Sequence, residues 1–264
     1  MHTPRPPCSI IRSVSIRAGT VAVLFDLDET LIPEHQPIVN AYRATAAAVF
    51  GDDPTEAQVA ELRQAARRYW EAYAPCPEYR VRVHLGPSDG LSSFFPGEGP
   101  ELEQLRAFVP EFHAHAFDAA LPPGTPNPGR LRDIWWAARI GTPTVFEGAR
   151  ELLARLRGDF RLAMVTNGAS DFQRRKIDAA ELAGYFDAII VSGDLGAGKP
   201  HPDPFLAALR ALDVSSDQAV MVGNDQERDI AGAQALGIRT IWVQPGDPEQ
   251  AGAVSDLTQI PALL

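Results

Sequence analysis

The residues best suited to chemistry in this chain begin at Asp26, where two carboxylates stand two positions apart. The D-x-D-x-T segment at residues 26–30 follows directly on the apolar run at residues 21–25. Such a run is typical of an interior strand, and ligands of open α/β sheets bind beyond the carboxyl ends of the strands. The pattern therefore indicates a nucleophile at Asp26 with an acid and base at Asp28. An ordinary turn between a strand and a helix is the alternative.

A second apolar run, residues 162–165, leads into Thr166, Asn167 and Gly168. A Thr hydroxyl and the free backbone N–H groups at the start of a helix are suitable donors to phosphoryl oxygens. Taken alone, the sequence is explained more simply as a turn that closes a strand.

A loop rich in Gly and Pro, residues 196–202, presents Lys199. The chain has 24 Lys and Arg residues, but only Lys176 and Lys199 are lysines. A compact ammonium can approach a carboxylate and a phosphoryl oxygen together, where a guanidinium would need more room. Lys199 is therefore a candidate partner of both, unless it is a solvated loop lysine.

The fourth group of polar residues follows the apolar run at residues 219–223. Asn224 and Asp225 come directly after it, and Asp229 returns one helical turn later. Oxygen ligands suit Mg²⁺, which takes one or two carboxylates together with water and substrate phosphate. The same acids would also cap the N-terminus of the next helix.

The predicted helices and strands between the four groups of polar residues would bring these groups to one edge of a sheet. From residue 144 onward, helical and strand patterns alternate, which implies a parallel sheet with right-handed crossovers that residues 21–25 join. The predicted helices are 147–157, 171–180, 203–212 and 228–236, and the predicted strands are 161–166, 187–191, 219–223 and 239–243.

Residues 34–143 predict an all-helical insert instead, because their apolar residues recur at helical spacing. The predicted helices are 38–50, 56–73 and 101–117, and the Pro- and Gly-rich separators are 86–100 and 122–129. We therefore expect an α/β protein with a Rossmann-like parallel sheet core, residues 20–33 and 144–264, and an inserted all-helical cap domain, residues 34–143. Residues 1–19 are expected to be a tail, with a short strand at residues 9–16.

Composition excludes several classes of protein. The 264 residues are 45% hydrophobic and 22% charged, which is typical of a soluble globular protein. A formal charge of -10 argues against nucleic-acid binding, and no apolar stretch is long enough to cross a bilayer. The two cysteines, Cys8 and Cys76, lack the spacing of a zinc or redox site and favour free thiols in a reducing cytoplasm.

In this order on the strand ends of one sheet, the four groups resemble the haloacid dehalogenase superfamily of phosphohydrolases, in the branch with a helical cap after the first motif. The resemblance covers residues 21–243. It implies that Asp26 forms an aspartyl-phosphate and that Asp28 is the general acid and base. The phosphate-binding residues that it implies are Thr166, Asn167 and Lys199. The Mg²⁺ ligands that it implies are Asp26, the backbone carbonyl of Asp28, and the group Asn224, Asp225 and Asp229.

One position departs from the family pattern, which usually has Asp directly after the Gly of the fourth motif. Here Asn224 follows Gly223. Either Asn224 occupies the ligand position and binds Mg²⁺ more weakly, or the turn shifts by one residue and Asp225 supplies the carboxylate. We expect a working site that uses one of them, with Asp229 in support.

The resemblance thus predicts a cytoplasmic, Mg²⁺-dependent phosphatase, monomeric or homodimeric, of a small phosphorylated metabolite in the nucleotide or sugar phosphate class. A dehalogenase would have no leaving oxygen for Asp28 to protonate. A phosphomutase of the same superfamily is one alternative, and a catalytically weak phosphate-binding protein, favoured only by Asn224, is another. Substrate specificity would lie in the cap, whose candidate residues are Arg43, Arg80, Arg82, His84, His113, His115, Trp135 and Trp136. Each of these also has an ordinary structural interpretation as a packed or solvated side chain.

Overall fold

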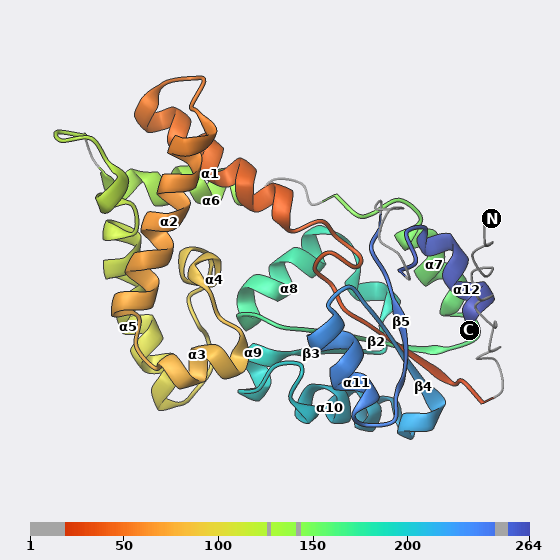
Figure 1. Ribbon diagram of the computed structural model, residues 1–264. Coiled ribbons are helices and arrows are strands. Elements are labelled where there is room, and N and C mark those ends of the chain that lie inside the picture. The colour runs from red at the N-terminus through yellow and green to blue at the C-terminus, as the bar shows by residue number, and fades with distance from the viewer. Residues whose placement is uncertain (1–18, 126–127, 141–143, 246–252) are drawn as a thin grey trace, which may run out of the picture.

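The computed structural model describes residues 19–125, 128–140, 144–245 and 253–264. It has an α/β lobe and a helical lobe that lie side by side (Figure 1). The strand predicted at residues 9–16 and Cys8 lie outside the described residues, and Cys76 is a free thiol. Within the described ranges, no helix is both long and apolar enough to cross a membrane.

The α/β lobe is built on one five-stranded sheet in which every paired strand is parallel. The strands are β1 (Ala22–Phe25), β2 (Arg161–Thr166), β3 (Ala188–Val191), β4 (Ala219–Gly223) and β5 (Arg239–Trp242), in the order β3-β2-β1-β4-β5. Phe25 is in register with Met164 and with Val222, so the carboxyl ends of β1, β2 and β4 align. The predicted parallel α/β sheet is confirmed, with β1, β3 and β5 each one residue shorter than predicted.

Side chains alternate between the two faces of β1 because successive residues of a strand point in opposite directions. Val23 and Phe25 pack with α7 (Ala149–Leu156) and α12 (Ile260–Leu263), whereas Ala22 and Leu24 pack with α10 (Pro202–Leu212). All four of these β1 side chains are fully buried. Burial on both faces explains why the sequence of this strand is continuously apolar rather than alternating.

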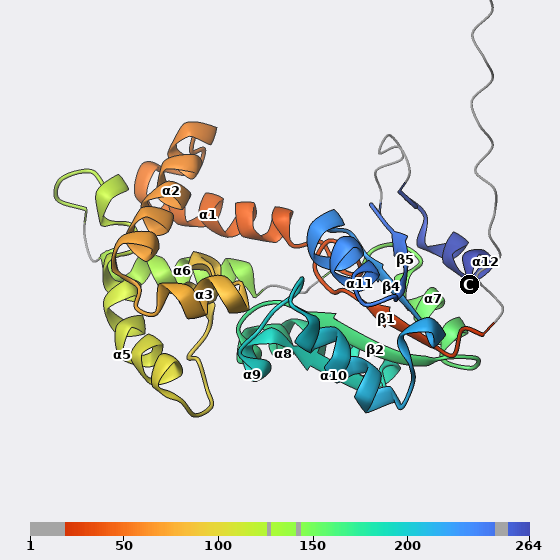
Figure 2. The ribbon, with the colours of Figure 1, turned by 60° about the horizontal axis from the view of Figure 1, so that its bottom comes forward.

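The helical lobe is inserted between β1 and β2, as predicted. Its helices are α1 (His35–Phe50), α2 (Glu56–Tyr73), α3 (Pro77–Val83), α4 (Pro87–Ser92), α5 (Pro100–His115) and α6 (Leu131–Arg139). Helix α1 extends from the α/β lobe into the helical lobe (Figures 1 and 2). The core of this lobe surrounds Trp70, Phe112 and Trp135, and it also receives Phe172 from the first helix after β2. The exact limits of the cap domain, residues 34–143, stay a prediction.

Several helices of the structure differ from the predicted set. Helix α4 lies inside the predicted separator 86–100, and α3, α6, α9 (Ser192–Leu195) and α12 were not predicted, because short helices are stabilised by packing more than by their own sequence. The predicted helix at residues 228–236 is wrong in form. A π-helical segment, Gln226–Ala231, precedes the short helix α11 (Gly232–Gln234). Gly232 lies against Pro200 here, where an added Cβ would be 3.0 Å from the Pro200 Cα.

Candidate active site

The sheet brings the four predicted groups of polar residues to one edge. Asp26 follows β1, Thr166 ends β2 and Asn224 follows β4, and β1 lies between the other two strands. The eight site residues predicted from the sequence line a single cavity of about 310 Å³: Asp26, Asp28, Thr166, Asn167, Lys199, Asn224, Asp225 and Asp229. Strand order therefore assembles a site from residues that are up to 203 positions apart, the distance along the chain from Asp26 to Asp229.

Lys199 bridges two carboxylates at the base of the cavity. Its ammonium Nζ donates to Asp26 Oδ1 and to Asp229 Oδ1, both at 2.6 Å, and Asp229 is fully buried. Burial alone would lower the pKa of Lys199, but the charges of Asp229 and Asp26 outweigh it and raise that pKa. Lys199 is therefore a buried cation and not a solvated loop lysine.

The electrostatic environment of Asp26 disfavours its charged form. Burial is the largest cause and raises the pKa of Asp26 to about 7, with Lys199 opposing it and Asp229 and Asp28 adding to it. A pKa near neutrality means that additional positive charge is needed to keep this carboxylate fully ionised at pH 7.

Asn167 fixes the loop that carries Lys199. Its side-chain Oδ1 accepts from the Lys199 backbone N–H at 2.8 Å, and its Nδ2 donates to the Lys199 carbonyl at 2.9 Å. Gly198 packs so closely that an added Cβ would lie 2.8 Å from Asn167 Oδ1. The side chain of Asn167 therefore acts on the position of Lys199.

Asp28 is held by two side chains from the helix α8 (Ser170–Ala179). Lys176 Nζ is 2.7 Å from each carboxylate oxygen of Asp28, and Gln173 Nε2 donates to Oδ2 at 3.0 Å. The same Gln173 nitrogen donates to Thr166 Oγ1 at 2.7 Å. Because Thr166 accepts this bond, its own hydroxyl hydrogen can be donated to a ligand in the cavity.

The structure distinguishes Asn224 from Asp225. The Thr30 hydroxyl lies 3.4 Å from Asn224 Oδ1 and 3.2 Å from Asp26 Oδ2, so the amide of Asn224 is directed toward Asp26. The carboxylate of Asp225 instead accepts from the backbone N–H groups of Glu227 and Arg228 and pairs with the Arg228 guanidinium. Asp225 is thus used as a helix cap. Burial would raise the pKa of Asp225, but the Arg228 guanidinium and then these backbone N–H groups hold that pKa below the ordinary value.

Comparison with known proteins identifies the family of this chain. A sequence model of the haloacid dehalogenase-like hydrolases matches residues 20–237. This chain belongs to that family. A phosphoserine phosphatase of Thermus thermophilus is 31% identical over 90% of this chain and 96% of its own length. A ribulose-1,5-bisphosphate 5-phosphatase of Halopiger xanaduensis is also 31% identical, over 89% of each chain.

Solved structures of the family have the same fold. A 2-haloacid dehalogenase from Pseudomonas syringae is 28% identical and has a TM-score of 0.57, covering 92% of this chain and 97% of its own. The magnesium-bound hydrolase YfnB of Bacillus subtilis has a TM-score of 0.62 over the same fractions, and at 20% identity its likeness concerns the fold alone. The resemblance inferred from the four motifs is confirmed.

The oxygens beside Asp26 fit the magnesium ion that many hydrolases of this family use. Asp26 Oδ2 and Asn224 Oδ1 both lie within 3.4 Å of the Thr30 hydroxyl, so a carboxylate oxygen and an amide oxygen face the same region. In the described part of the chain, no three Asp, Glu, His or Cys side chains gather closely enough to hold a metal on their own. Mg²⁺ does not need such a cage, because it keeps several waters and takes substrate phosphate as a ligand. Asp229 is turned toward Lys199 and supports that lysine.

Two residues that contact Asp28, Gln173 and Lys176, were not among the predicted site residues. Both approach Asp28 from α8, about 145 positions along the chain. The scarcity of lysine was the signal that could have identified Lys176. The chain has two lysines, and each pairs with one aspartate of the first motif, Lys176 with Asp28 and Lys199 with Asp26.

The cap residues suggested by the sequence do not line the cavity that contains Asp26. Arg43 pairs with Glu56, His115 pairs with Asp118, and Trp135 is fully buried in the cap. Among the described residues, those that the cap side contributes to the cavity are Glu34, His35 and Ile38, at the start of α1. The periodicity of the sequence cannot identify these residues, because the tertiary structure decides which part of a segment lies beside the cavity.

Gly223 leaves no room for a side chain beside Asp229. An added Cβ would lie 2.4 Å from Asp229 Oδ2 and 2.5 Å from its Cγ. We expect Gly223→Ala to displace Asp229 and to lower the free energy of unfolding by about 1–3 kcal/mol, as in other overpacked cores. Urea unfolding measures this. Gly184→Ala is the matched control, since nothing lies within 4 Å of its added Cβ, and equal effects of the two substitutions would contradict the close-packing argument.

Proposed function

We propose that this chain hydrolyses small organic phosphomonoesters in a Mg²⁺-dependent reaction that passes through an aspartyl-phosphate at Asp26. The observation that carries the proposal is the pair of aspartates at one cavity, each with its own lysine: Asp26 with Lys199 at 2.6 Å, and Asp28 with Lys176 at 2.7 Å. A binding protein would need neither a buried nucleophile nor an acid beside it. The two phosphatases that are 31% identical act, by their names, on small phosphorylated metabolites, which supports this substrate class.

Binding of the phosphoryl group follows from the donors at the strand ends. Lys199 offers an ammonium beside Asp26, and the hydroxyl of Thr166 is free to donate. Asn167 contributes by fixing the backbone of Lys199. These donors offset the repulsion between a phosphate dianion and the carboxylates of the cavity.

The reaction has two steps. In the first, a carboxylate oxygen of Asp26 attacks phosphorus, the bond from phosphorus to the ester oxygen breaks, and protonated Asp28 gives its proton to the leaving alkoxide. In the second, a water oxygen attacks the phosphorus of the phosphorylated Asp26, Asp28 takes a proton of that water, and the bond from phosphorus to the Asp26 oxygen breaks, so that phosphate leaves and the carboxylate is restored. Each step reverses the protonation of Asp28, so the enzyme returns to its starting state.

The residues that would hold Mg²⁺ are Asp26, Asn224 and the backbone carbonyl of Asp28. The bound ion would supply positive charge to the carboxylate of Asp26 and to the phosphoryl oxygens. The raised pKa of Asp26, about 7, is consistent with a site built to receive such a charge.

The experiment that tests the proposal is phosphate release from a panel of phosphoserine, sugar phosphates, nucleoside monophosphates and an aryl phosphate, with Mg²⁺ and with EDTA. We expect release with Mg²⁺ and its loss with EDTA. Halide release from a 2-haloacid is measured in parallel, because one structural relative is a dehalogenase. Halide release without phosphate release would contradict the proposal.

The identity of the metal ligand after Gly223 is tested by two substitutions. Asn224→Asp adds a charge at the position directed toward Asp26, and we expect the Mg²⁺ concentration for half-maximal activity to fall about tenfold. Asp225→Asn is the matched comparison. Since Asn is also a good helix cap, we expect little change in stability and none in the Mg²⁺ requirement. The opposite pattern would assign the ligand position to Asp225.

A further inference from the structure

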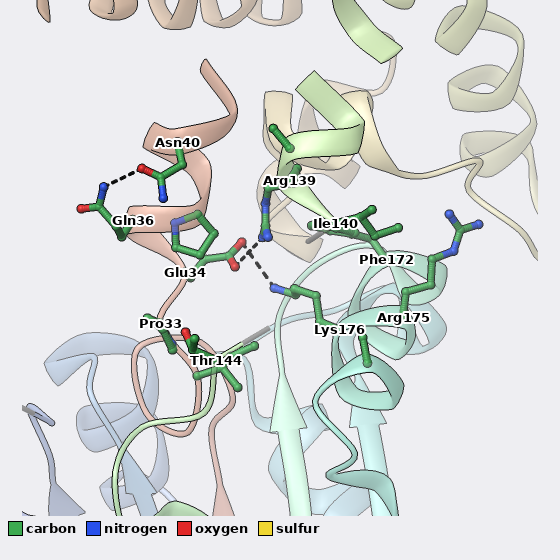
Figure 3. Close-up of a pocket in the computed structure, with 14 residues that line it drawn as sticks. Pro33, Glu34, Gln36, Asn40, Arg139, Ile140, Thr144, Phe172, Arg175 and Lys176 are labelled. Atoms are coloured by element: carbon green, nitrogen blue, oxygen red, sulfur yellow. Dashed lines mark hydrogen bonds and ion pairs between the residues drawn. The ribbon is translucent and has the colours of Figure 1, made fainter. Parts of the chain in front are cut away.

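The ion pair between Lys176 and Asp28 is one link in a longer chain of charges. Figure 3 shows Glu34 between Arg139 and Lys176, on the wall of a second cavity next to the active site. Lys176 Nζ is 3.4 Å from Glu34 Oε1, and Arg139 donates to Glu34 Oε2 at 2.5 Å. The chain Asp28, Lys176, Glu34, Arg139 therefore runs from the active site to α6, the last helix before β2 in the inserted lobe.

We infer that Lys176 is a positioning residue that fixes the carboxylate of Asp28 for proton transfer and ties it, through Glu34, to Arg139 of the cap. The inference rests on the proposed function. It assigns to the second lysine a task distinct from that of Lys199, which binds the nucleophile.

The contacts of Asp28 leave its carboxylate little freedom. Lys176 Nζ is equally close to both oxygens, at 2.7 Å, and Gln173 adds a third bond to Oδ2. Lys176 and Gln173 are three positions apart on α8 and so lie on one face of the helix. Because Gln173 also donates to Thr166, this face sets the acid and base relative to a phosphate-binding hydroxyl.

Lys176 is itself held firmly. Its side chain is 7% exposed, and its Nζ lies 5.0 Å from the centre of the Phe172 ring, as does the guanidinium carbon of Arg139. A buried ammonium is stable only when it is paired, and here both of its carboxylate partners line the active-site cavity. A lysine with a purely structural task would need no partner among the catalytic residues.

The leaving group provides a test that separates this task from a structural one. Expulsion of an alkoxide needs a proton from Asp28, whereas 2,4-dinitrophenolate leaves without one. We expect Lys176→Met to slow the single-turnover cleavage of the best alkyl phosphate about 100-fold, and to change the burst of dinitrophenolate from its phosphate ester by less than about threefold.

Two further variants complete the comparison. Asp28→Asn should also slow cleavage of the alkyl phosphate much more than the burst from the dinitrophenyl ester. The double variant with Lys176→Met should lose little more activity than Asp28→Asn alone, because the two residues act as one unit. Arg174→Met is the control on α8, since Arg174 pairs with Asp194 at the surface, and it should behave as the wild type. If Lys176→Met does not fold, Lys176→Gln is tested instead, because it keeps a hydrogen-bond donor on a side chain of similar length. It should slow cleavage of the alkyl phosphate about tenfold more than it slows the dinitrophenolate burst.

The outcomes are distinguishable. An equal loss of rate for both esters, in a variant with wild-type thermal unfolding, would reduce Lys176 to a structural or general electrostatic role and overturn the inference. No loss for either ester would do the same. A wild-type chain that cleaves neither ester would overturn the proposed function first, and the inference with it.

Discussion

Asp26→Asn is expected to lower turnover of any phosphomonoester substrate by at least about a thousandfold, because an amide is not a nucleophile toward phosphorus. The fold should remain, since the substitution hardly changes the side-chain volume. Lys199 keeps its second carboxylate partner, Asp229, at 2.6 Å. Substrate binding should also persist, because the substitution leaves the donors to the phosphoryl group unchanged.

Rapid acid quench and intact-protein mass spectrometry test this result directly. The wild type should carry one added phosphoryl group during turnover, and Asp26→Asn should carry none. Asp178→Asn, an exposed position on α8, is the matched control and should turn over normally. Phosphorylation of the Asp26→Asn variant, or turnover near the wild-type rate, would remove Asp26 from the nucleophile position.

Lys199→Met has the second large expected effect, on stability as well as on activity. The Lys199 side chain is 2% exposed and its ammonium bridges Asp26 and Asp229, so its removal leaves two carboxylates without their buried cation. Loss of one partner from a buried ion pair is destabilising by about 3–5 kcal/mol. We expect a decrease of this size in urea unfolding at pH 7, and no measurable phosphate release.

A double variant separates the two effects of Lys199. The double variant Lys199→Met with Asp229→Asn also removes one of the two unpaired carboxylates. We expect it to recover part of the lost stability but no activity. Lys199→Arg keeps the charge and should still lose activity, because the forked guanidinium does not fit between carboxylates that are each 2.6 Å from Nζ. Full activity of Lys199→Arg would show that charge alone suffices at this position.

Much of the fold and of the candidate site could be predicted from local sequence. The apolar runs before Asp26 and Asn224 and up to Thr166 mark buried strands, because a strand covered on both faces must be continuously apolar. Alternating elements then imply a parallel sheet, whose carboxyl ends form a single edge. The position of Asp26, Thr166 and Asn224 at one edge of the sheet follows from these two facts.

Side-chain partners could not be predicted in this way. Asn224 and Asp225 are neighbours in the sequence, and only the path of the turn directs the first toward Asp26 and leaves the second to cap a helix. The segment that follows, Gln226–Ala231, is π-helical, a form that no helical period in the sequence reveals.

The pairing of Lys176 with Asp28 is the clearest case. The two residues are 148 positions apart, and they meet because β1 and β2 are neighbours in the sheet and α8 begins beyond the end of β2. Periodicity and residue type are local properties of the sequence. They identify the helices and strands and the polar residues that follow each strand. Contacts between distant elements depend on strand order and packing. The sequence therefore made Lys199 a candidate partner of a carboxylate, and the tertiary structure alone pairs Lys176 with Asp28.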